Sequence, residues 1–296
     1  MIIDIHAHLA YTHIFPKHFI SDMFLGLSEN ERTKLEKILP MFMKDKNGSA
    51  FINQMDMAGI NKAVLLIVDA GVRLGESKLS LDEIYELHYE ILKKNSDRII
   101  VFAGIDPRRG EKGFNLFKKG IFEFGFKGLK LYPPMGFAID DERLNPYYEI
   151  CSAYRLPVIT HTGSSLSYLD NHYADPIFIK NVANRFKDVI FILAHAANNI
   201  TPKIIELVKE CDNIYLDMAG LNSKYNLDNY CSIFDENIND KVLFGSDWPL
   251  FNLLHPINRD IMLLKKSFEN IRQPNDRALD NIFYKNAIKI LSINKI

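Results

Sequence analysis

The sequence has few cysteines and no excess of charge of either sign. Its three cysteines, Cys151, Cys211 and Cys231, are odd in number and lack C-x-x-C spacing. Neither a disulfide framework nor a thiolate zinc site is therefore predicted, and inert packing is expected for all three. The 36 Lys and Arg residues are balanced by 37 Asp and Glu residues. Nothing in that balance indicates a cationic surface for phosphates, so we expect no nucleic-acid partner.

Long hydrophobic runs are also missing from the sequence. No uninterrupted apolar stretch approaches the roughly 20 residues that span a bilayer. The first residues, MIIDIHAHLA, lack a basic segment and are interrupted by Asp4, unlike a secretory leader. The hydrophobic fraction of 47% is nevertheless sufficient for a large core. The expectation is a cytoplasmic protein with no membrane partner.

Eight short apolar runs alternate with amphipathic stretches along the chain. The predicted strands cover residues 2–8, 62–68, 98–105, 128–132, 156–161, 189–195, 213–219 and 241–247. Several runs are almost continuously apolar, as parallel strands buried on both faces are. Helical patterns, with apolar residues three and four apart, include residues 81–95, 141–154 and 201–210. The pattern predicts an α/β fold, a single (β/α)8 TIM barrel over residues 1–296, with a doubly wound open sheet as the alternative.

The connection between the first two predicted strands is unusually long. Within it, residues 10–47 are mixed and only weakly periodic. In a barrel this insertion after strand 1 lies at the catalytic face, where it could form a lid; a structural decoration or an oligomer contact is equally compatible. After the last strand, residues 258–270 and 276–293 are predicted to form C-terminal closing helices.

Ionisable side chains fall at the ends of the predicted strands. His6 and His8 end the first, His161 the fifth, His195 the sixth and Asp247 the eighth. Barrel active sites are built at these C-terminal ends, and a spacing of two places His6 and His8 on one face of a strand. Three imidazoles and a carboxylate suit Zn²⁺ with an open position for water, and Mn²⁺ or Fe²⁺ are alternatives. By contrast, His88 is expected to be a partly exposed helix residue.

Lys130 and Asp4 are assigned by strand parity. In GLKLY, Leu129 and Leu131 share one face, so Lys130 points into the barrel if the leucines face the helices. It could then be a carbamylated metal bridge, a cation that binds an anionic substrate, or a structural charge. The same parity places Asp4 on the face of His6 and His8, where it would accept a hydrogen bond from a ligand or pair with Lys130.

Five motifs and the C-terminal end of the sequence resemble those of a known family. The motifs IDIHAH, GLKLYPP, ITHTG, LAHAA and FGSDWP occur in that order, followed by FYKNAIKIL near the end. Together they resemble the amidohydrolase superfamily, and most closely its amidohydrolase 2 branch, which includes aminocarboxymuconate-semialdehyde decarboxylase and other aromatic-acid decarboxylases and hydrolases. The resemblance covers essentially the whole chain. A metal-dependent nuclease group with a similar first strand has a strand-four glutamate where Lys130 stands here.

The resemblance implies a role for each matched residue. His6, His8, His161 and Asp247 match the metal ligands of the superfamily. His195 matches a histidine that is catalytic in mononuclear decarboxylases and a ligand in binuclear members. Lys130 matches a position that is carbamylated in some binuclear members, but the branch often carries an unmodified lysine there. We therefore expect one Zn²⁺ and an unmodified Lys130, and a homodimer by similarity.

Three functions fit this site. The first is a hydrolase acting on a small, carboxylate-bearing amide, ester or lactone, with a metal-activated water, Asp247 as general base and His195 assisting. The second is non-oxidative decarboxylation of an unsaturated or aromatic acid by the same residues. The third is a non-catalytic metal-binding barrel. Arg108, Arg109, Tyr132 and Trp248 lie near strand ends and are candidate substrate contacts, although a solvated loop charge is the favoured role for the two arginines.

Overall fold

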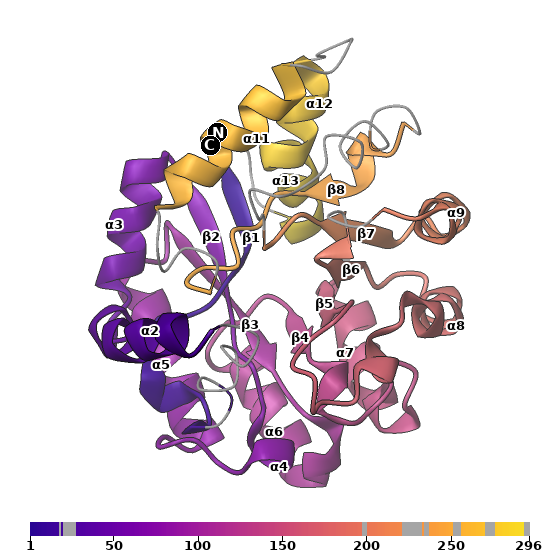
Figure 1. Cartoon of the computed structure of the whole chain (residues 1–296). Helices are drawn as coiled ribbons and strands as arrows, with labels where there is room; N and C mark the ends of the chain where they lie inside the picture. Colours follow the sequence, from indigo (N-terminus) through magenta and orange to yellow (C-terminus); the bar gives the residue numbers. More distant parts are fainter. Residues whose placement is uncertain are drawn as a thin grey trace.

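The computed structural model describes residues 1–17, 19, 28–196, 200–220, 233, 237–250, 256–269 and 276–292. Eight parallel strands follow one another in the order β1 to β8, each paired with the next (Figure 1). Backbone bonds close the sheet: Ile5 N donates to Phe244 O at 2.9 Å and His8 N to Trp248 O at 2.7 Å. The predicted (β/α)8 barrel is confirmed, and the open-sheet alternative is wrong. Within the described ranges, no helix is long and apolar enough to cross a membrane.

All eight predicted strands are present, and each is shorter than its apolar run. They are β1 (Ile3–Ala7), β2 (Lys62–Leu66), β3 (Ile99–Gly104), β4 (Leu129–Leu131), β5 (Val158–His161), β6 (Phe191–Ala194), β7 (Ile214–Asp217) and β8 (Val242–Leu243). At the C-terminal end of the barrel, His8, His195 and Asp247 lie just beyond the regular ladder. His6 and His161 lie within the last residues of β1 and β5.

Helices surround the barrel, as Figure 1 shows. They are α3 (Ser49–Ala58), α4 (Gly71–Leu74), α5 (Leu81–Lys94), α6 (Gly110–Phe122), α7 (Asn145–Tyr154), α8 (Ile179–Arg185) and α9 (Pro202–Glu210). The predicted closing helices are α11 (Ile257–Glu269) and the series α12 (Asp276–Asp280), a π-helical turn (Asn281–Lys285) and α13 (Asn286–Leu291). Helix α5 begins with a capping box, in which Ser80 and Glu83 satisfy each other's backbone amides.

The insertion between β1 and β2 contains a short 3-10 turn (Thr12–Ile14) and helix α2 (Glu29–Phe42). Residues 18 and 20–27, and with them His18, lie outside the described residues. Helix α3 follows the insertion and was not predicted. It runs between Gly48 and Gly59, both in the left-handed region, and its Phe51 stacks on Trp248 with ring centroids 6.2 Å apart. This contact packs α3, which directly follows the insertion, against the residue next to Asp247. The role of the insertion as a lid stays a prediction.

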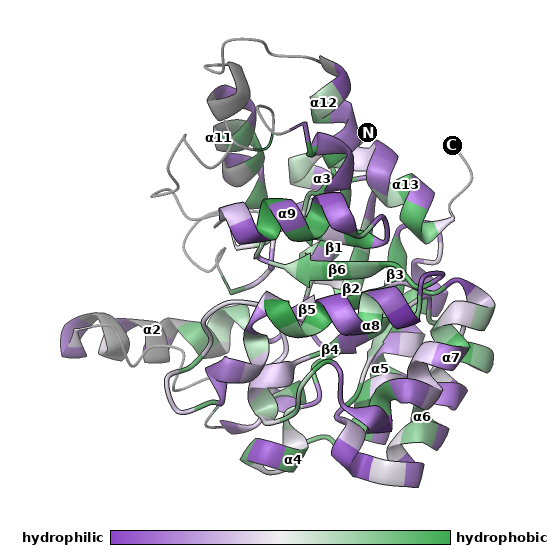
Figure 2. Cartoon of the chain, turned by 90° about the vertical axis from the view of Figure 1, so that its right-hand side faces the viewer, coloured by the Kyte–Doolittle hydropathy of each residue, from purple (hydrophilic) through white to green (hydrophobic). Residues whose placement is uncertain are grey.

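Apolar side chains pack in two layers, one between the sheet and the helices and one inside the barrel. The inner layer includes Val64, Leu66, Phe102, Ile159 and Ile192. The visible strands are largely hydrophobic, whereas the outer helices carry hydrophilic stripes (Figure 2). This is the pattern of parallel strands covered on both faces.

His88, which was predicted to be partly exposed, is fully buried. Its Nδ1 donates to the carbonyl of Ile84, one turn earlier in α5, at 2.8 Å. That bond lets the imidazole lie on the packed face of the helix in its neutral form. Burial lowers the pKa of His88 to about 4, because a charged imidazole would lose its hydration there.

Strand β1 contains a bulge that changes the parity of its side chains. Asp4 lies opposite Ala63 and Ala7 opposite Leu65, so three steps along β1 match two along β2. Ala63 and Leu65 belong to the outer apolar layer. Asp4 therefore faces the helices, whereas His6 and His8 face the barrel. The prediction that Asp4 shares a face with the two histidines is wrong, because an extra residue in a strand re-aims the side chains that follow it.

Candidate metal centre

Three potential ligand atoms converge where β1 and β8 meet. His6 Nε2 lies 3.3 Å from His8 Nε2. Asp247 Oδ1 lies 3.4 Å from His6 Nε2 and 3.3 Å from His8 Nε2. Bonds of about 2.0–2.1 Å to a tetrahedral zinc ion place neighbouring ligand atoms about 3.3–3.4 Å apart. The three atoms thus already have the spacing that a shared cation requires.

The hydrogen bonds of the two imidazoles define which nitrogen is free. His6 Nδ1 donates to Asp217 Oδ2, and His8 Nδ1 donates to the carbonyl of Leu66, each at 2.9 Å. In the neutral rings, both Nε2 atoms therefore present lone pairs, and neither has a proton to offer the other. Two lone pairs and a carboxylate oxygen at this spacing repel one another unless a cation lies among them. The donor set fits a divalent metal ion.

His161 is the fourth metal ligand that the sequence predicts. Its Nε2 is buried and has no hydrogen-bond partner. The ring is stacked against Tyr132, with centroids 4.5 Å apart, and stands edge-on to His195 at 4.8 Å. A buried imidazole nitrogen left without a partner is costly, and metal coordination would satisfy it. Three of the four predicted ligands, His6, His8 and Asp247, therefore lie within one group of potential metal ligands, and the assignment of His161 as the fourth stays a prediction.

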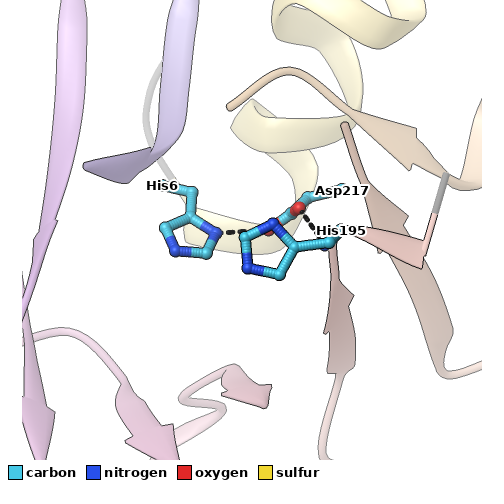
Figure 3. Close-up of side chains that lie close together, drawn as sticks. All are labelled: His6, His195 and Asp217. Atoms are coloured by element: carbon cyan, nitrogen blue, oxygen red, sulfur yellow. Dashed lines mark hydrogen bonds and ion pairs between the residues drawn. The ribbon is translucent and has the colours of Figure 1, made fainter. Parts of the chain in front are cut away.

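Asp217, at the end of β7, is a functional residue that the sequence prediction missed. Besides binding the ring of His6, it accepts a hydrogen bond from the backbone N–H group of His195 at 2.7 Å (Figure 3). It also accepts one from the backbone N–H group of Ala219 at 3.0 Å. A carboxylate that orients a metal-binding imidazole raises its basicity and fixes its tautomer. Its position in the sequence could have indicated this role, because Asp217 ends a strand, as the predicted metal ligands do.

Burial and charge set the protonation states in favour of cation binding. Burial, with Lys130 nearby, lowers the pKa of His6 well below its usual range, and burial with His195 does the same for His161. Burial alone would raise the pKa of Asp247, but His6, His8 and His195 outweigh it and lower that pKa to about 2. The rings of His6 and His161 are therefore held neutral and Asp247 is an ionised carboxylate, the forms that bind metals.

Asp4 accepts a hydrogen bond from a predicted ligand residue, His6, as expected, but from the backbone amide and not from the ring, and it is not paired with Lys130 among the described residues. Its Oδ1 accepts from the backbone N–H groups of His6 at 3.1 Å and Ser246 at 3.0 Å, and its Oδ2 accepts from the Ser246 hydroxyl at 2.6 Å. The physical reason is the bulge, which turns Asp4 outward and leaves the amide of His6 for its carboxylate. Burial raises the pKa of Asp4 to about 7, although the hydrogen bonds from Ser246 and His6 lower it.

Lys130 points into the barrel, as predicted, because Leu129 and Leu131 belong to the outer layer. Its ammonium group is buried and makes no hydrogen bond. Burial lowers its pKa to about 8, although Asp217 and Asp247 attract the charged form. Whether Lys130 bridges metals or binds substrate stays a prediction.

The predicted arginine contacts are engaged elsewhere. Arg109 pairs with Asp69, at 2.6 Å and 2.8 Å, and with Glu76, while Arg108 pairs with Asp106 at 2.9 Å and 2.5 Å. We call these five residues the rim network. Because Asp69 and Asp106 are buried, they hold the guanidinium groups in place, and neither arginine borders the cavity beside the metal centre.

Tyr132 borders that cavity, and its hydroxyl shares a 2.7 Å hydrogen bond with the Ser165 hydroxyl. Trp248 instead lies buried against Phe51. Of the other histidines, His13 contacts Tyr11 and Lys78, and His172 packs on Tyr173 and Phe178. Both lie away from the cavity lining, and His255 lies outside the described residues.

A cavity of about 930 Å³ opens from the metal centre. His161, His195 and Asp247 form its inner end, and Phe19 and Tyr132 are next to them. The His195 Nδ1 donates to the carbonyl of Ala219 at 3.0 Å, which leaves Nε2 as the reactive nitrogen of the neutral ring. A bound molecule could therefore meet the metal ligands, an acid–base histidine and an aromatic wall together.

Comparison with known proteins shows where this fold recurs. The chain is similar over its full length to solved structures. One is an uncharacterised TIM-barrel protein from Bordetella bronchiseptica, at 21% identity and a TM-score of 0.70, covering 98% of each chain. Another is a dihydroxybenzoic acid decarboxylase from Polaromonas sp. JS666 with bound manganese and 2-nitroresorcinol, at 18% identity and a TM-score of 0.67, covering 100% of this chain and 98% of the other.

A third is 5-carboxyvanillate decarboxylase from Sphingomonas paucimobilis, at 14% identity and a TM-score of 0.65, covering 99% of each chain. At these identities the likeness shows a shared fold. A search of curated proteins finds no match. The family described as Amidohydrolase, by contrast, matches residues 3–293. The chain belongs to the amidohydrolase 2 family.

Proposed function

We propose that this protein is a metal-dependent, non-oxidative decarboxylase of a small unsaturated or aromatic carboxylic acid. The observation that carries the proposal is the convergence of His6 Nε2, His8 Nε2 and Asp247 Oδ1 within 3.4 Å of one another. The centre borders a cavity with an aromatic wall. Two of the structural neighbours are decarboxylases of aromatic acids, which supports this reaction over hydrolysis by the same residues.

His6, His8, His161 and Asp247 would hold the cation, which we propose to be one Zn²⁺ or Mn²⁺ per chain. When bound, the metal supplies a Lewis acid that neutralises negative charge on the substrate. Asp217 keeps His6 in its metal-binding tautomer. The open face of the centre toward the cavity favours an enzyme over a non-catalytic metal-binding barrel, because a structural metal site is closed by protein ligands.

His195 would handle the proton of the reaction. Loss of CO₂ breaks the bond between the carboxyl carbon and the substrate carbon that carries it, and the electron pair stays on that substrate carbon. A proton must then be added there. His195 borders the cavity, and its Nε2 is the nitrogen not used by Ala219, so a proton taken up from solvent could be delivered from Nε2. The Tyr132 ring would form one wall for the substrate body.

The decisive experiment measures CO₂ release and hydrolysis in parallel. Protein loaded with Zn²⁺ or Mn²⁺ would be tested on hydroxylated benzoic acids, unsaturated carboxylic acids, lactones and esters, with metal content determined by elemental analysis. We expect CO₂ release that His195→Asn abolishes while metal content stays unchanged. Hydrolysis without CO₂ release would favour the hydrolase alternative, and neither activity in fully loaded protein would contradict both.

A further inference from the structure

A pair of buried residues ties the first and last strands together on the outer face of the barrel. The Ser246 hydroxyl donates to Asp4 Oδ2 at 2.6 Å, between residues 242 positions apart in sequence. Asp4 is fully buried and Ser246 is 2% exposed. We call this pair the clamp. It lies behind the metal centre, because Asp4 faces the outer layer while the ligands face the barrel.

The clamp joins the two strands, β1 and β8, whose alignment sets the distances between the ligand atoms. His6 and His8 come from β1, whereas Asp247 follows β8, so any slip between these strands changes all three ligand distances. Yet β8 has only two residues in regular ladder geometry, and β1 is bulged. Gly245 approaches β1 so closely that a Cβ there would lie 2.8 Å from the Cβ of His6. Backbone hydrogen bonds join the two segments, among them Asp247 N to His6 O at 2.8 Å, and the clamp adds side-chain hydrogen bonds to them.

The clamp supplies those bonds to the backbone on both strands. Asp4 accepts from His6 N, the amide that the bulge displaces, and from Ser246 N. Ser246 Oγ accepts in turn from Trp248 N at 3.1 Å. The amides on either side of Asp247 are thereby fixed. This matters because Asp247 has a positive φ of 54°, a conformation that costs a non-glycine residue about 1–3 kcal/mol and persists only when its surroundings hold it.

We propose that Ser246 and Asp4 are positioning residues that set the metal affinity of the centre without touching the metal. The inference rests on the metal centre of the proposed function and adds residues to it. The clamp holds the three ligand atoms at coordination distance before the cation arrives, so binding does not have to reorganise the junction between β1 and β8. Residues that orient metal ligands typically change affinity about 10- to 100-fold when they are replaced.

The test compares Ser246→Ala with Tyr85→Phe in the full-length protein. The Tyr85 hydroxyl is also buried and donates to the carbonyl of Gly104 at 3.0 Å, so Tyr85→Phe removes a hydrogen bond of the same kind far from β8. Zn²⁺ affinity would be measured by competition with a chelating dye, and the unfolding of the metal-free proteins by urea. The absorption spectrum of bound Co²⁺ reports the coordination geometry.

We expect both variants to lose similar stability in the metal-free form. Only Ser246→Ala should raise the Kd for Zn²⁺, about tenfold or more, and alter the Co²⁺ spectrum. Asp4→Asn, which keeps an acceptor oxygen for the backbone amides, should weaken binding less. A Kd for Ser246→Ala within twofold of the wild type would overturn the clamp and leave the metal centre intact. A wild-type protein that binds no metal in this titration would overturn both.

Discussion

The junction of β1 and β8 and the rim network above β2 and β3 both combine buried carboxylates with basic side chains, but they pair them differently. In the rim network, Arg109 and Arg108 each meet a buried aspartate through two hydrogen bonds. At the junction, His6 Nε2, His8 Nε2 and Asp247 Oδ1 face one another. The two Nε2 lone pairs and the carboxylate oxygen repel one another, and a cation between them would remove that repulsion.

The difference separates charges that stabilise the fold from charges available for chemistry. A charge already neutralised by a rigid bidentate partner has little left for a ligand. His161 Nε2 and Lys130 Nζ, which have no hydrogen-bond partner among the described residues, lie instead on the side of the metal centre. In this barrel, proximity to a strand end was therefore insufficient to identify a substrate contact, and the partners of each charged group decided its role.

The largest expected effect is loss of the metal. Replacing both His6 and His8 by alanine removes two of the three converging ligand atoms, so we expect the purified protein to contain no stoichiometric metal and to lose activity. Elemental analysis after dialysis measures this directly. Metal content equal to that of the wild type would show that the cation binds somewhere else.

Asp217→Asn tests the carboxylate that orients the predicted ligand His6 and leaves His6 itself unchanged. The amide can still contact His6, but it no longer stabilises the imidazole with a negative charge, and its NH₂ group can face a donor. We expect Zn²⁺ affinity to fall about 10- to 100-fold, as measured by chelator competition. An unchanged affinity would mean that the hydrogen bond in Figure 3 serves only the packing of β1 and β7.

Arg109→Met should change stability and spare the metal. It leaves the buried Asp69 carboxylate without its main partner, which costs about 3 kcal/mol of unfolding free energy. Urea unfolding gives the loss, and Zn²⁺ affinity should match the wild type. Arg143→Met is the matched control, because the Arg143 side chain is 53% exposed in its pair with Asp141 and should contribute less than about 1 kcal/mol. A weakened metal site in Arg109→Met would contradict the separation of the two regions.

Lys130→Met should make the metal-free protein more stable at pH 7, by an amount that shrinks as the pH rises. The pKa of Lys130 is lowered from 10.5 to about 8 in the folded protein. Between these values the unfolded chain binds more protons than the folded one, so wild-type stability increases with pH and the advantage of methionine declines. Urea unfolding at pH 7 and pH 9.5 tests this, and Lys127→Met is the control at an exposed lysine on the same segment.

Tyr132→Phe should have the smallest effect. It removes the hydrogen bond to Ser165, which contributes about 1 kcal/mol, but keeps the ring stacked on His161. Metal affinity should stay within twofold of the wild type in chelator competition. A large loss would indicate that the hydroxyl, and not the ring, holds His161 in position.

The sequence predicted the strands, and it singled out the candidate ligands His6, His8 and Asp247 that lie together in the structure, because each prediction rests on a local pattern. Apolar runs locate all eight strands, and His6, His8, His161 and Asp247 follow from polar residues at their ends. Asp4 could not be placed correctly, because the bulge that reverses its orientation depends on how β1 pairs with β2 and β8. Asp217 and the partners of Arg109 were missed for a similar reason: they are contacts between segments far apart in sequence.

The closure of the barrel by its first and last strands also has a consequence for synthesis. His6 and His8 are synthesised well before Ser246 and Asp247. A nascent chain can fold locally as it emerges from the ribosome, but it cannot assemble this centre until the eighth strand has been made. If the centre binds a metal as proposed, a bound ion would therefore mark a barrel whose last strand is in register.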